Sequence, residues 1–244
     1  MSASGPNQRV TYTATIERIV DHAEDTRSLF LRLPAATDFT FTPGQFISIA
    51  IPLPGETRVR PYTLASSPED DGPLEIVFNL VPGGAGSEYL FRRGAGDQLN
   101  FTGPFGLFTL DRAPEVETIF AAEGTAIAPI RPMIRRALAQ PPTAPLKLFH
   151  AARTRSELLY AEEFDAAAMR CPNFTFEPIL AQPPPAWSGR CGQLLEHLQG
   201  LFVDGDQRRD RAFYLCGVGT PVIDLRDLLR KSGYARRAVQ YERW

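Results

Sequence analysis

The strongest constraint in this sequence is a change of hydrophobic period part-way along the chain. From residue 9 to about 102, apolar and polar residues alternate in six short runs that are separated by Pro, Gly and Asp. In the run "LEIVFNLV", for example, Leu74, Ile76 and Phe78 fall on one face. A period of two is typical of half-buried strands. Six such strands at short spacing predict an antiparallel six-stranded β-barrel.

The pattern changes between residues 103 and 115. Short apolar runs then alternate with helical periodicity, as in "ETIFAAE" before "IAPIRPMIRRALA" and "AFYLCG" before "PVIDLRDLLRKSG". Strands that alternate with helices imply right-handed βαβ units and a parallel sheet covered on both faces. We therefore predict a disordered N-terminus over residues 1–8, a β-barrel domain over 9–108 and an α/β domain over 109–244.

Composition narrows the classes of function. The net charge is -2, which gives no electrostatic reason to expect binding to nucleic acid or to a membrane surface. The N-terminus lacks an export signal, and no run reaches the roughly 18 apolar residues of a membrane span, so we expect a cytoplasmic protein. The three cysteines are widely spaced and the three histidines lack metal-site spacing, so no metal is expected. Redox chemistry would then require an organic cofactor.

Three glycine-containing segments are candidates for ligand binding. In "VPGGAGSEYL" the glycines permit close backbone approach, and Ser87 is placed to cap the following helix, which favours a pyrophosphate site. In "AAEGTAIAPI", Gly124 and Thr125 lie at the turn between the first strand and helix of the α/β half. In "AFYLCGVGTPV", Cys216 ends a strand at the expected ligand-binding edge. An ordinary capped turn, a plain strand–turn–helix unit and a buried hydrophobic cysteine are the respective alternatives.

Taken together, these segments resemble the ferredoxin–NADP reductase superfamily. "RPYTLASS" is similar to the family's Arg-x-Tyr-Ser/Thr flavin motif, and "GGAGS" to its pyrophosphate motif. "EGTAIAPI" resembles the nicotinamide-nucleotide loop, "CGVGTPV" the Cys-Gly turn, and "YERW" the C-terminal glutamate and aromatic residue. The motifs occur in the family's order. The resemblance implies an FAD-dependent NAD(P)H oxidoreductase, with FAD favoured over FMN because the pyrophosphate motif is present.

The resemblance also implies roles for individual residues around FAD. Arg60 would neutralise the pyrophosphate, Tyr62 would pack against the flavin and ribityl chain, and Thr63 would place its hydroxyl near flavin N5. The terminal Trp244 would lie over the flavin and move before the nicotinamide stacks there. The full set of FAD-binding residues implied in this way is Arg60, Pro61, Tyr62, Thr63, Val77, Gly84, Ala85, Gly86, Ser87 and Trp244.

For hydride transfer, the resemblance places the nicotinamide beside Thr63, Cys216 and Glu242, which are the expected catalytic residues. The expected NAD(P)H-binding residues are Gly124, Thr125, Arg153, Arg155, Cys216 and Gly217.

The chain departs from the family pattern at several positions. Glu123 and Ala126 replace glycines of the nucleotide loop, and Val218 replaces a proline after Cys-Gly. Glu123 adds a negative charge close to a phosphate site, which would weaken binding. Ala181-Gln182 replaces a Ser-Arg pair of NADP-specific members and favours NADH. In the other direction, NADPH is favoured by three arginines, namely Arg153, Arg155 and Arg190, so the choice between NADH and NADPH stays open.

The expected reaction passes electrons singly to a protein acceptor, namely a ferredoxin, a flavodoxin or an oxygenase component, and we expect a monomer. A free-flavin or small-acceptor reductase is one alternative. A non-catalytic nucleotide- or partner-binding subunit is another, with Glu123 and Val218 as signs of lost activity. Several arginines form either a docking face for an acidic partner or an ordinary solvated surface. They are Arg92, Arg93, Arg131, Arg135, Arg136, Arg236 and Arg237.

Overall fold

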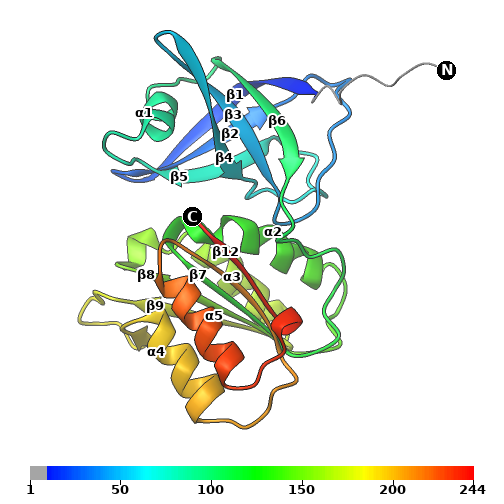
Figure 1. Ribbon diagram of the computed structural model, residues 1–244, viewed down its shortest axis with the longest axis vertical. Coiled ribbons are helices and arrows are strands. Elements are labelled where there is room, and N and C mark those ends of the chain that lie inside the picture. The colour runs from blue at the N-terminus through cyan, green and yellow to red at the C-terminus, as the bar shows by residue number, and fades with distance from the viewer. Residues whose placement is uncertain (1–9) are drawn as a thin grey trace, which may run out of the picture.

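The computed structural model describes residues 10–244, so the predicted disordered segment 1–8 lies outside the described part of the chain. The N-terminal half is an antiparallel six-stranded sheet in the order β4-β3-β6-β1-β2-β5 (Figure 1). Its elements are β1 (Thr11–Ala23), β2 (Thr26–Arg32), β3 (Phe46–Leu53), β4 (Glu56–Thr63), β5 (Leu74–Asn79), helix α1 (Ala85–Phe91) and β6 (Gln98–Phe105).

The predicted alternation packs the interior of this sheet. Ile47, Ile49 and Ile51 of β3 all point inward and are fully buried, as a period of two requires. Just beyond the end of β4, Leu64 forms an isolated antiparallel bridge with Ile76 of β5. This bridge brings the two edge strands together. The sheet therefore curls into a barrel around one apolar core.

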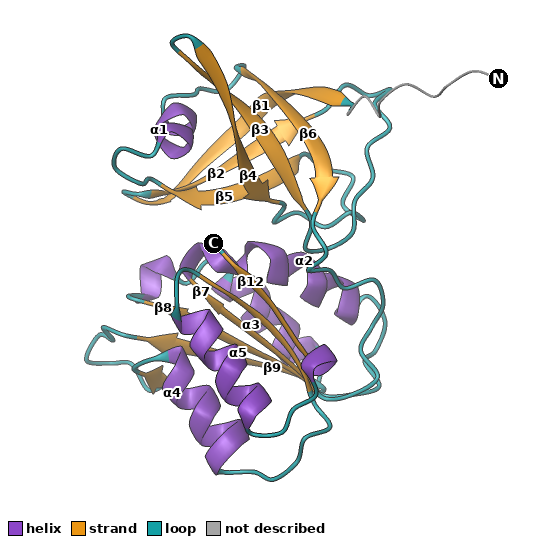
Figure 2. Ribbon diagram, viewed as in Figure 1, coloured by secondary structure: helices purple, strands orange, loops and turns teal. Residues whose placement is uncertain are grey.

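The C-terminal half is a parallel six-stranded sheet in the order β10-β9-β8-β7-β11-β12, with helices on both faces (Figure 2). Its strands are β7 (Thr118–Glu123), β8 (Leu146–Ala152), β9 (Phe174–Leu180), β10 (Arg190–Cys191), β11 (Ala212–Gly217) and β12 (Val239–Arg243). Its helices are α2 (Ile127–Leu138), α3 (Ala161–Arg170), α4 (Leu194–Gln199) and α5 (Pro221–Lys231). Short 3₁₀ helices η1 (Gly124–Ala126), η2 (Arg155–Glu157) and η4 (Arg236–Ala238) and a π-helical turn η3 (Gly200–Asp204) are also present.

The helices divide between the two faces of this sheet. α2 and α3 pack in one apolar cluster with Phe120 of β7, whereas α4 and α5 pack in another with Ile119 of the same strand. The chain runs outward from β7 through β8 to β10, and then returns to add β11 and β12 on the other side of β7. The crevice between β7 and β11 is therefore a topological switch point, where open α/β sheets bind ligands. The predicted fold class is confirmed in both halves.

A buried polar cluster joins the barrel to the α/β half. The Glu75 side chain, which is 5% exposed, accepts hydrogen bonds from Ser28 at 2.8 Å, from Tyr160 at 2.8 Å and from Arg131 at 2.7 Å. Arg131 also donates to the carbonyl oxygen of Ala65 and pairs with Glu163. Burial opposes the charge on Arg131, but the hydrogen bond and charge of Glu163 and the charge of Glu75 raise its pKa overall. This interdomain cluster therefore keeps its charged groups paired on both sides of the junction.

The arginines of α2 are paired within the chain. Arg131 is in the interdomain cluster, Arg135 pairs with Asp70 and Glu163, and Arg136 pairs with Glu69. Asp70 and Glu69 belong to the loop of the barrel half before β5. These three arginines are therefore already paired with carboxylates of the same chain, and a docking face for an acidic partner stays a prediction.

Replacing Arg131 tests how strongly the interdomain cluster stabilises the protein. In the Arg131→Met variant, the buried side chain of Glu75 loses its cationic partner, which typically costs about 3 kcal/mol. We expect the free energy of unfolding to fall by about that amount, as measured by denaturant titration. The matched control is Arg112→Met, which removes an exposed pair with Glu115 and should change stability by less than about 1 kcal/mol. Equal effects of the two substitutions would contradict the role of the cluster.

Candidate functional site

The largest of the cavities between the two halves has a volume of about 500 Å³ and is lined by residues of both. From the barrel it takes Thr63 and its neighbours on β4, together with side chains of β3 and β5. From the α/β half it takes the nucleotide loop, the turn after β11 and the C-terminal tail. Its lining residues are Phe46, Pro61, Tyr62, Thr63, Val77, Phe78, Asn79, Val81, Thr125, Val218, Glu242, Arg243 and Trp244.

A second, more open groove of about 370 Å³ continues from this cavity along the barrel. The two share four lining residues, namely Pro61, Tyr62, Asn79 and Val81. The groove adds Arg58, Arg60 and the run Gly83, Gly84, Ala85, Gly86 and Ser87. The predicted flavin-motif strand and the predicted pyrophosphate loop therefore face one continuous space.

The groove has the charge and shape that an anion needs. The Arg60 guanidinium forms no ion pair with any described residue, and its one side-chain hydrogen bond goes to the carbonyl oxygen of Val59. Arg58, by contrast, is paired with Glu56. A Cβ atom on Gly86 would lie 2.7 Å from the Tyr62 hydroxyl and 2.9 Å from Cγ of Arg60. Glycine therefore leaves room for the arginine and the phenol at this close approach, whereas a larger residue would force a side chain to shift.

Tyr62 and Thr63 stand at the junction of groove and cavity. Burial raises the pKa of Tyr62 to about 12, so the phenol stays protonated, and its ring packs edge-on against Phe78 with centroids 5.4 Å apart. Thr63 is the last residue of β4 and is buried. Both residues line the large cavity, to which Tyr62 adds a mainly apolar ring.

The expected cap by Ser87 is not found. Helix α1 begins at Ala85 after Gly84, without a side-chain cap, and Ser87 lies inside its first turn. The Ser87 hydroxyl accepts a hydrogen bond from the Val81 amide at 3.0 Å and is within reach of the Gly84 carbonyl oxygen. Ser87 therefore closes the glycine turn from within. The capping prediction was wrong because the helix starts two residues earlier than the serine.

The C-terminal tail completes the cavity from the other half. The Trp244 amide donates to the Gly217 carbonyl oxygen at 3.1 Å, and the Gly219 amide donates to the Trp244 carbonyl oxygen at 3.2 Å. These bonds hold Glu242 and Trp244 against the turn after β11. Burial raises the pKa of Glu242, and one of its carboxylate oxygens is buried without a hydrogen-bond partner among the described residues.

Cys216 lies deeper than the other two expected catalytic residues. It pairs in register with Glu242 across β11 and β12, but it is 2% exposed and does not line the large cavity. Burial raises the pKa of its thiol well above the usual value, and the charge of Glu242 acts in the same direction. Cys216 is therefore a buried, neutral thiol that lies outside the large cavity, next to Gly217.

The nucleotide loop is held from two sides. Gly124 has a φ of +53°, and its carbonyl oxygen accepts a hydrogen bond from Nε2 of the fully buried His150 at 3.2 Å. Thr125 donates its hydroxyl to Oδ1 of Asn79 at 2.8 Å, and Asn79 donates to Thr26 at 2.7 Å. The loop is therefore tied both to its own sheet and to the barrel.

The two expected coenzyme arginines differ in position. Arg153 lines a cavity of about 150 Å³ with Gly124, Thr125 and Asn79, where its guanidinium pairs with Glu157 at 2.7 Å. Arg155 is exposed and lies over the ring of Trp187, 5.7 Å from the centroid, away from these cavities. The structure thus brings Arg153 to the loop and leaves Arg155 apart.

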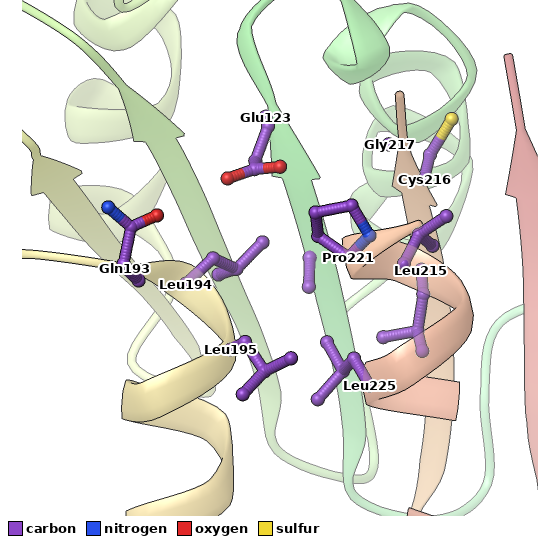
Figure 3. A pocket seen from close by; sticks show the side chains of 11 residues that line it. Glu123, Gln193, Leu194, Leu195, Leu215, Cys216, Gly217, Pro221 and Leu225 are labelled. Atoms are coloured by element: carbon purple, nitrogen blue, oxygen red, sulfur yellow. The ribbon is translucent and has the colours of Figure 1, made fainter. Parts of the chain in front are cut away.

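Sequence reasoning missed Asn79, which lines three of the cavities at the junction. Its signal was a polar residue at the end of the alternating run "LEIVFN", directly before the glycine loop. Glu123 was noted only as a departure from a pattern. Figure 3 shows its carboxylate in a separate small cavity with Cys216 and Gly217.

The arrangement suits an elongated ligand with one anionic and one flat apolar part. An unpaired guanidinium and a glycine cradle form the groove, and the aromatic-lined cavity lies next to it. These features fit FAD, whose diphosphate and ring system have these properties. Within residues 10–244, no helix has the length and apolar character that crossing a bilayer requires.

Two family models match the chain in succession. Residues 13–110 match an oxidoreductase FAD-binding domain, and residues 120–224 match an oxidoreductase NAD-binding domain. The first range contains Arg60, Tyr62 and Ser87. The second contains Gly124 and Cys216.

Curated relatives carry related names. The chain is 34% identical over 212 residues to "Ferredoxin--NADP reductase B" of Sorangium cellulosum, covering 84% of this chain and 86% of the relative. It is 32% identical over 216 residues to the phenol 2-monooxygenase reductase component DmpP of a Pseudomonas species, covering 87% of this chain but 59% of the relative. It also spans only 54% of the length of the aromatic O-demethylase reductase subunit of an Amycolatopsis species.

Solved structures share the fold over almost the whole chain. The Amycolatopsis cytochrome P450 reductase GcoB superposes with a TM-score of 0.84 at 28% identity, covering 96% of this chain and 69% of that one. A ferredoxin NADP+ reductase from Neisseria gonorrhoeae with bound FAD and NADP superposes with a TM-score of 0.81 at 19% identity, covering 96% and 98%. At that identity the second likeness shows the fold alone.

The glycine cradle can be tested directly. In the Gly86→Ala variant the added Cβ would overlap Tyr62 and Arg60, so both side chains must shift out of the groove. We expect the purified variant to retain less than about a tenth of the wild-type flavin per protein, measured by absorbance. Gly94→Ala is the matched control, because a Cβ there meets no atom within 4 Å. Full flavin content in Gly86→Ala would refute the cradle.

Proposed function

Because this chain belongs to the FAD- and NAD(P)-dependent reductases of the ferredoxin–NADP reductase superfamily, we propose that it passes electrons from NAD(P)H to a separate one-electron acceptor protein. The acceptor we propose is a ferredoxin, a flavodoxin or an oxygenase component. A relative named as the reductase component of a phenol 2-monooxygenase and one named as the electron transfer component of a toluate 1,2-dioxygenase support this class of acceptor.

One observation carries the proposal. The cavity of about 500 Å³ joins Thr63 of the barrel to Glu242 and Trp244 of the α/β half, and it opens into the groove of Arg60 and Gly86. A flavin ring in the cavity would have its diphosphate beside the unpaired guanidinium. The same cavity reaches Thr125 of the nucleotide loop. Both redox partners would therefore meet in one space, as hydride transfer requires.

When bound, FAD supplies the chemistry, since it takes up a hydride and gives up its electrons one at a time. The residues of this chain bind and orient it. Arg60 would balance the charge of the diphosphate, with Gly84, Ala85, Gly86 and Ser87 forming the opposite wall of the groove. Tyr62 would pack its protonated phenol ring against the flavin, and Pro61 and Val77 would contribute apolar surface beside it.

Other residues would arrange the transfer step. The Thr63 hydroxyl would donate or accept a hydrogen bond at the reacting edge of the flavin, and the partly buried carboxyl of Glu242 would face the nicotinamide. Cys216 would support this position as a neutral thiol beneath Gly217. Trp244 lines the cavity and would cover the flavin until the nicotinamide replaces it. Gly124, Thr125 and Arg153 would bind the phosphates of NAD(P)H, with Arg155 as a more distant candidate.

We also propose a division into domains over 9–108 and 109–244, which the two separate sheets and the two family-model ranges support. A monomeric state and a cytoplasmic location remain proposals. The three free cysteines are compatible with a reducing compartment. Sedimentation would test the monomeric state, and cell fractionation would test the location.

Reduction by coenzyme tests the proposed function as a whole. The purified protein should carry a bound flavin whose absorbance bleaches on anaerobic titration with NADH or NADPH, and a ferredoxin should reoxidise it. Bleaching without transfer to any one-electron acceptor protein would instead indicate a small-acceptor reductase. A protein that binds nucleotide without bleaching would be a non-catalytic subunit.

The role of Thr63 has its own test. Thr63→Val keeps the shape of the side chain but removes the hydroxyl, so we expect the rate of flavin reduction to fall about tenfold with flavin content unchanged. Stopped-flow absorbance measures the rate. Thr57→Val, at an exposed position of the same strand, is the control and should react at the wild-type rate. An unchanged rate in Thr63→Val would remove the hydroxyl from the proposed step.

A further inference from the structure

Glu123 lies at the switch point of the α/β sheet and has no role in the function proposed above. It is the last residue of β7 and shares the side of the strand on which Ala121 packs against α4 and α5. Its carboxylate lines a cavity of about 30 Å³ between the ends of β7 and β11 and the starts of α4 and α5 (Figure 3). The other lining residues are Ala121, Gln193, Leu194, Leu195, Leu215, Cys216, Gly217, Pro221, Val222 and Leu225.

The Glu123 carboxylate lacks a counter-ion. No arginine, lysine or histidine lines its cavity, and no ion pair or hydrogen bond joins it to another described residue. Burial raises the pKa of Glu123, since apolar side chains surround much of the carboxyl group. A partly buried carboxylate without a partner loses hydration without compensation. Its position at the ligand-binding edge indicates that the partner is supplied by a ligand.

The size of the cavity restricts which ligand group can enter. A cavity of about 10–15 Å³ holds one water molecule. The cavity at Glu123, with a volume of about 30 Å³, therefore admits one or two hydroxyl-sized groups. A phosphate group is larger and would also repel the carboxylate. In NAD(P)H, the neutral donors of this size are the ribose hydroxyls, the carboxamide and the adenine amino group. Of these, the ribose hydroxyls are nearest to the phosphates, which the adjoining Gly124–Thr125 loop would bind.

On the proposed function, which this inference requires, we propose that Glu123 accepts a hydrogen bond from a ribose hydroxyl of NAD(P)H. The ribose would lie over the mouth of the cavity, with a hydroxyl pointing between Glu123 and Gly217. The phosphates would then lie on the other side of the loop, towards Thr125 and the first turn of α2. Glu123 is thus a binding residue for the coenzyme, where a glycine would provide no acceptor.

The residues at the mouth of the cavity support this position of the ribose. A Cβ on Gly217 would lie 3.9 Å from a carboxylate oxygen of Glu123 and 3.3 Å from Val222. Glycine at this position therefore leaves the approach to the carboxylate open. α5 begins with Pro221, which is compatible with the first helical position and presents no side-chain donor that would satisfy Glu123 internally.

The first test replaces the carboxylate with its neutral isostere. In Glu123→Gln, we expect the KM for both NADH and NADPH to rise about tenfold with kcat nearly unchanged, because charge-assisted hydrogen bonds are stronger than neutral ones. Glu123→Ala, which removes the acceptor, should raise KM further. Glu196→Gln, an exposed carboxyl on α4 outside the cavity, is the matched control and should leave KM unchanged. Flavin content and unfolding midpoint check that each variant is folded.

The second test measures binding without turnover and identifies the ribose. AMP and reduced nicotinamide mononucleotide each carry one of the two riboses, and calorimetry gives their Kd for wild type and for Glu123→Gln. About tenfold weaker binding of one fragment supports the proposal and assigns that ribose. Unchanged binding of both fragments overturns it. Tighter binding of either fragment also overturns it, because the carboxylate would then be repelling phosphate.

Different results would contradict the proposed function and the proposed role of Glu123. If saturating NADH and NADPH do not bleach the flavin of the wild-type protein, the proposed function fails. If the wild-type and Glu123→Gln proteins bleach alike, with the same KM for both coenzymes, only the role of Glu123 fails.

Discussion

The buried pairing of Glu75 with Arg131 is the interaction on which the rest of the site depends. The proposed cofactor cavity has walls from two halves that could each form a core alone, so its shape exists only if the halves keep a fixed relation. Glu75 sits on the strand β5 that lines the cavity, and Arg131 sits on the helix that follows the nucleotide loop. A charge pair at this junction is costly to separate because both partners would lose compensation in a buried setting.

The same junction connects the two proposed ligand sites. Asn79 ends β5 and accepts a hydrogen bond from Thr125, so the loop for NAD(P)H and the wall of the flavin cavity share one contact. The C-terminal tail adds a second connection, since Trp244 is hydrogen-bonded to the turn after β11 and also lines the cavity. The nucleotide loop, the C-terminal tail and the wall of the large cavity are therefore joined by short, direct contacts.

The positive and negative side chains around the site lie at different places. An unpaired cation, Arg60, lies where a diphosphate is expected, while the carboxyls of Glu123 and Glu242 lie where neutral donors of the nicotinamide nucleotide would approach. Burial raises the pKa of both carboxyls, and neither has a cationic partner among the described residues. On the proposed roles, Arg60 would balance the charge of the diphosphate, whereas Glu123 would bind the sugar and Glu242 would face the reacting ring. The separation avoids placing anionic side chains against anionic ligand groups.

The sequence alone determined the two-part fold, because hydrophobic periods of 2.0 and 3.6 are local properties that decide which faces are buried. It also marked the strand with Arg60 and the glycine loop with Gly86, since these residue types carry conformational and charge requirements of their own. Tertiary structure decided what lies opposite each of them. The pairing of the α2 arginines with the barrel, the junction role of Asn79 and the cavity at Glu123 depend on contacts between segments far apart in the chain. Such contacts produce no periodic pattern in the sequence.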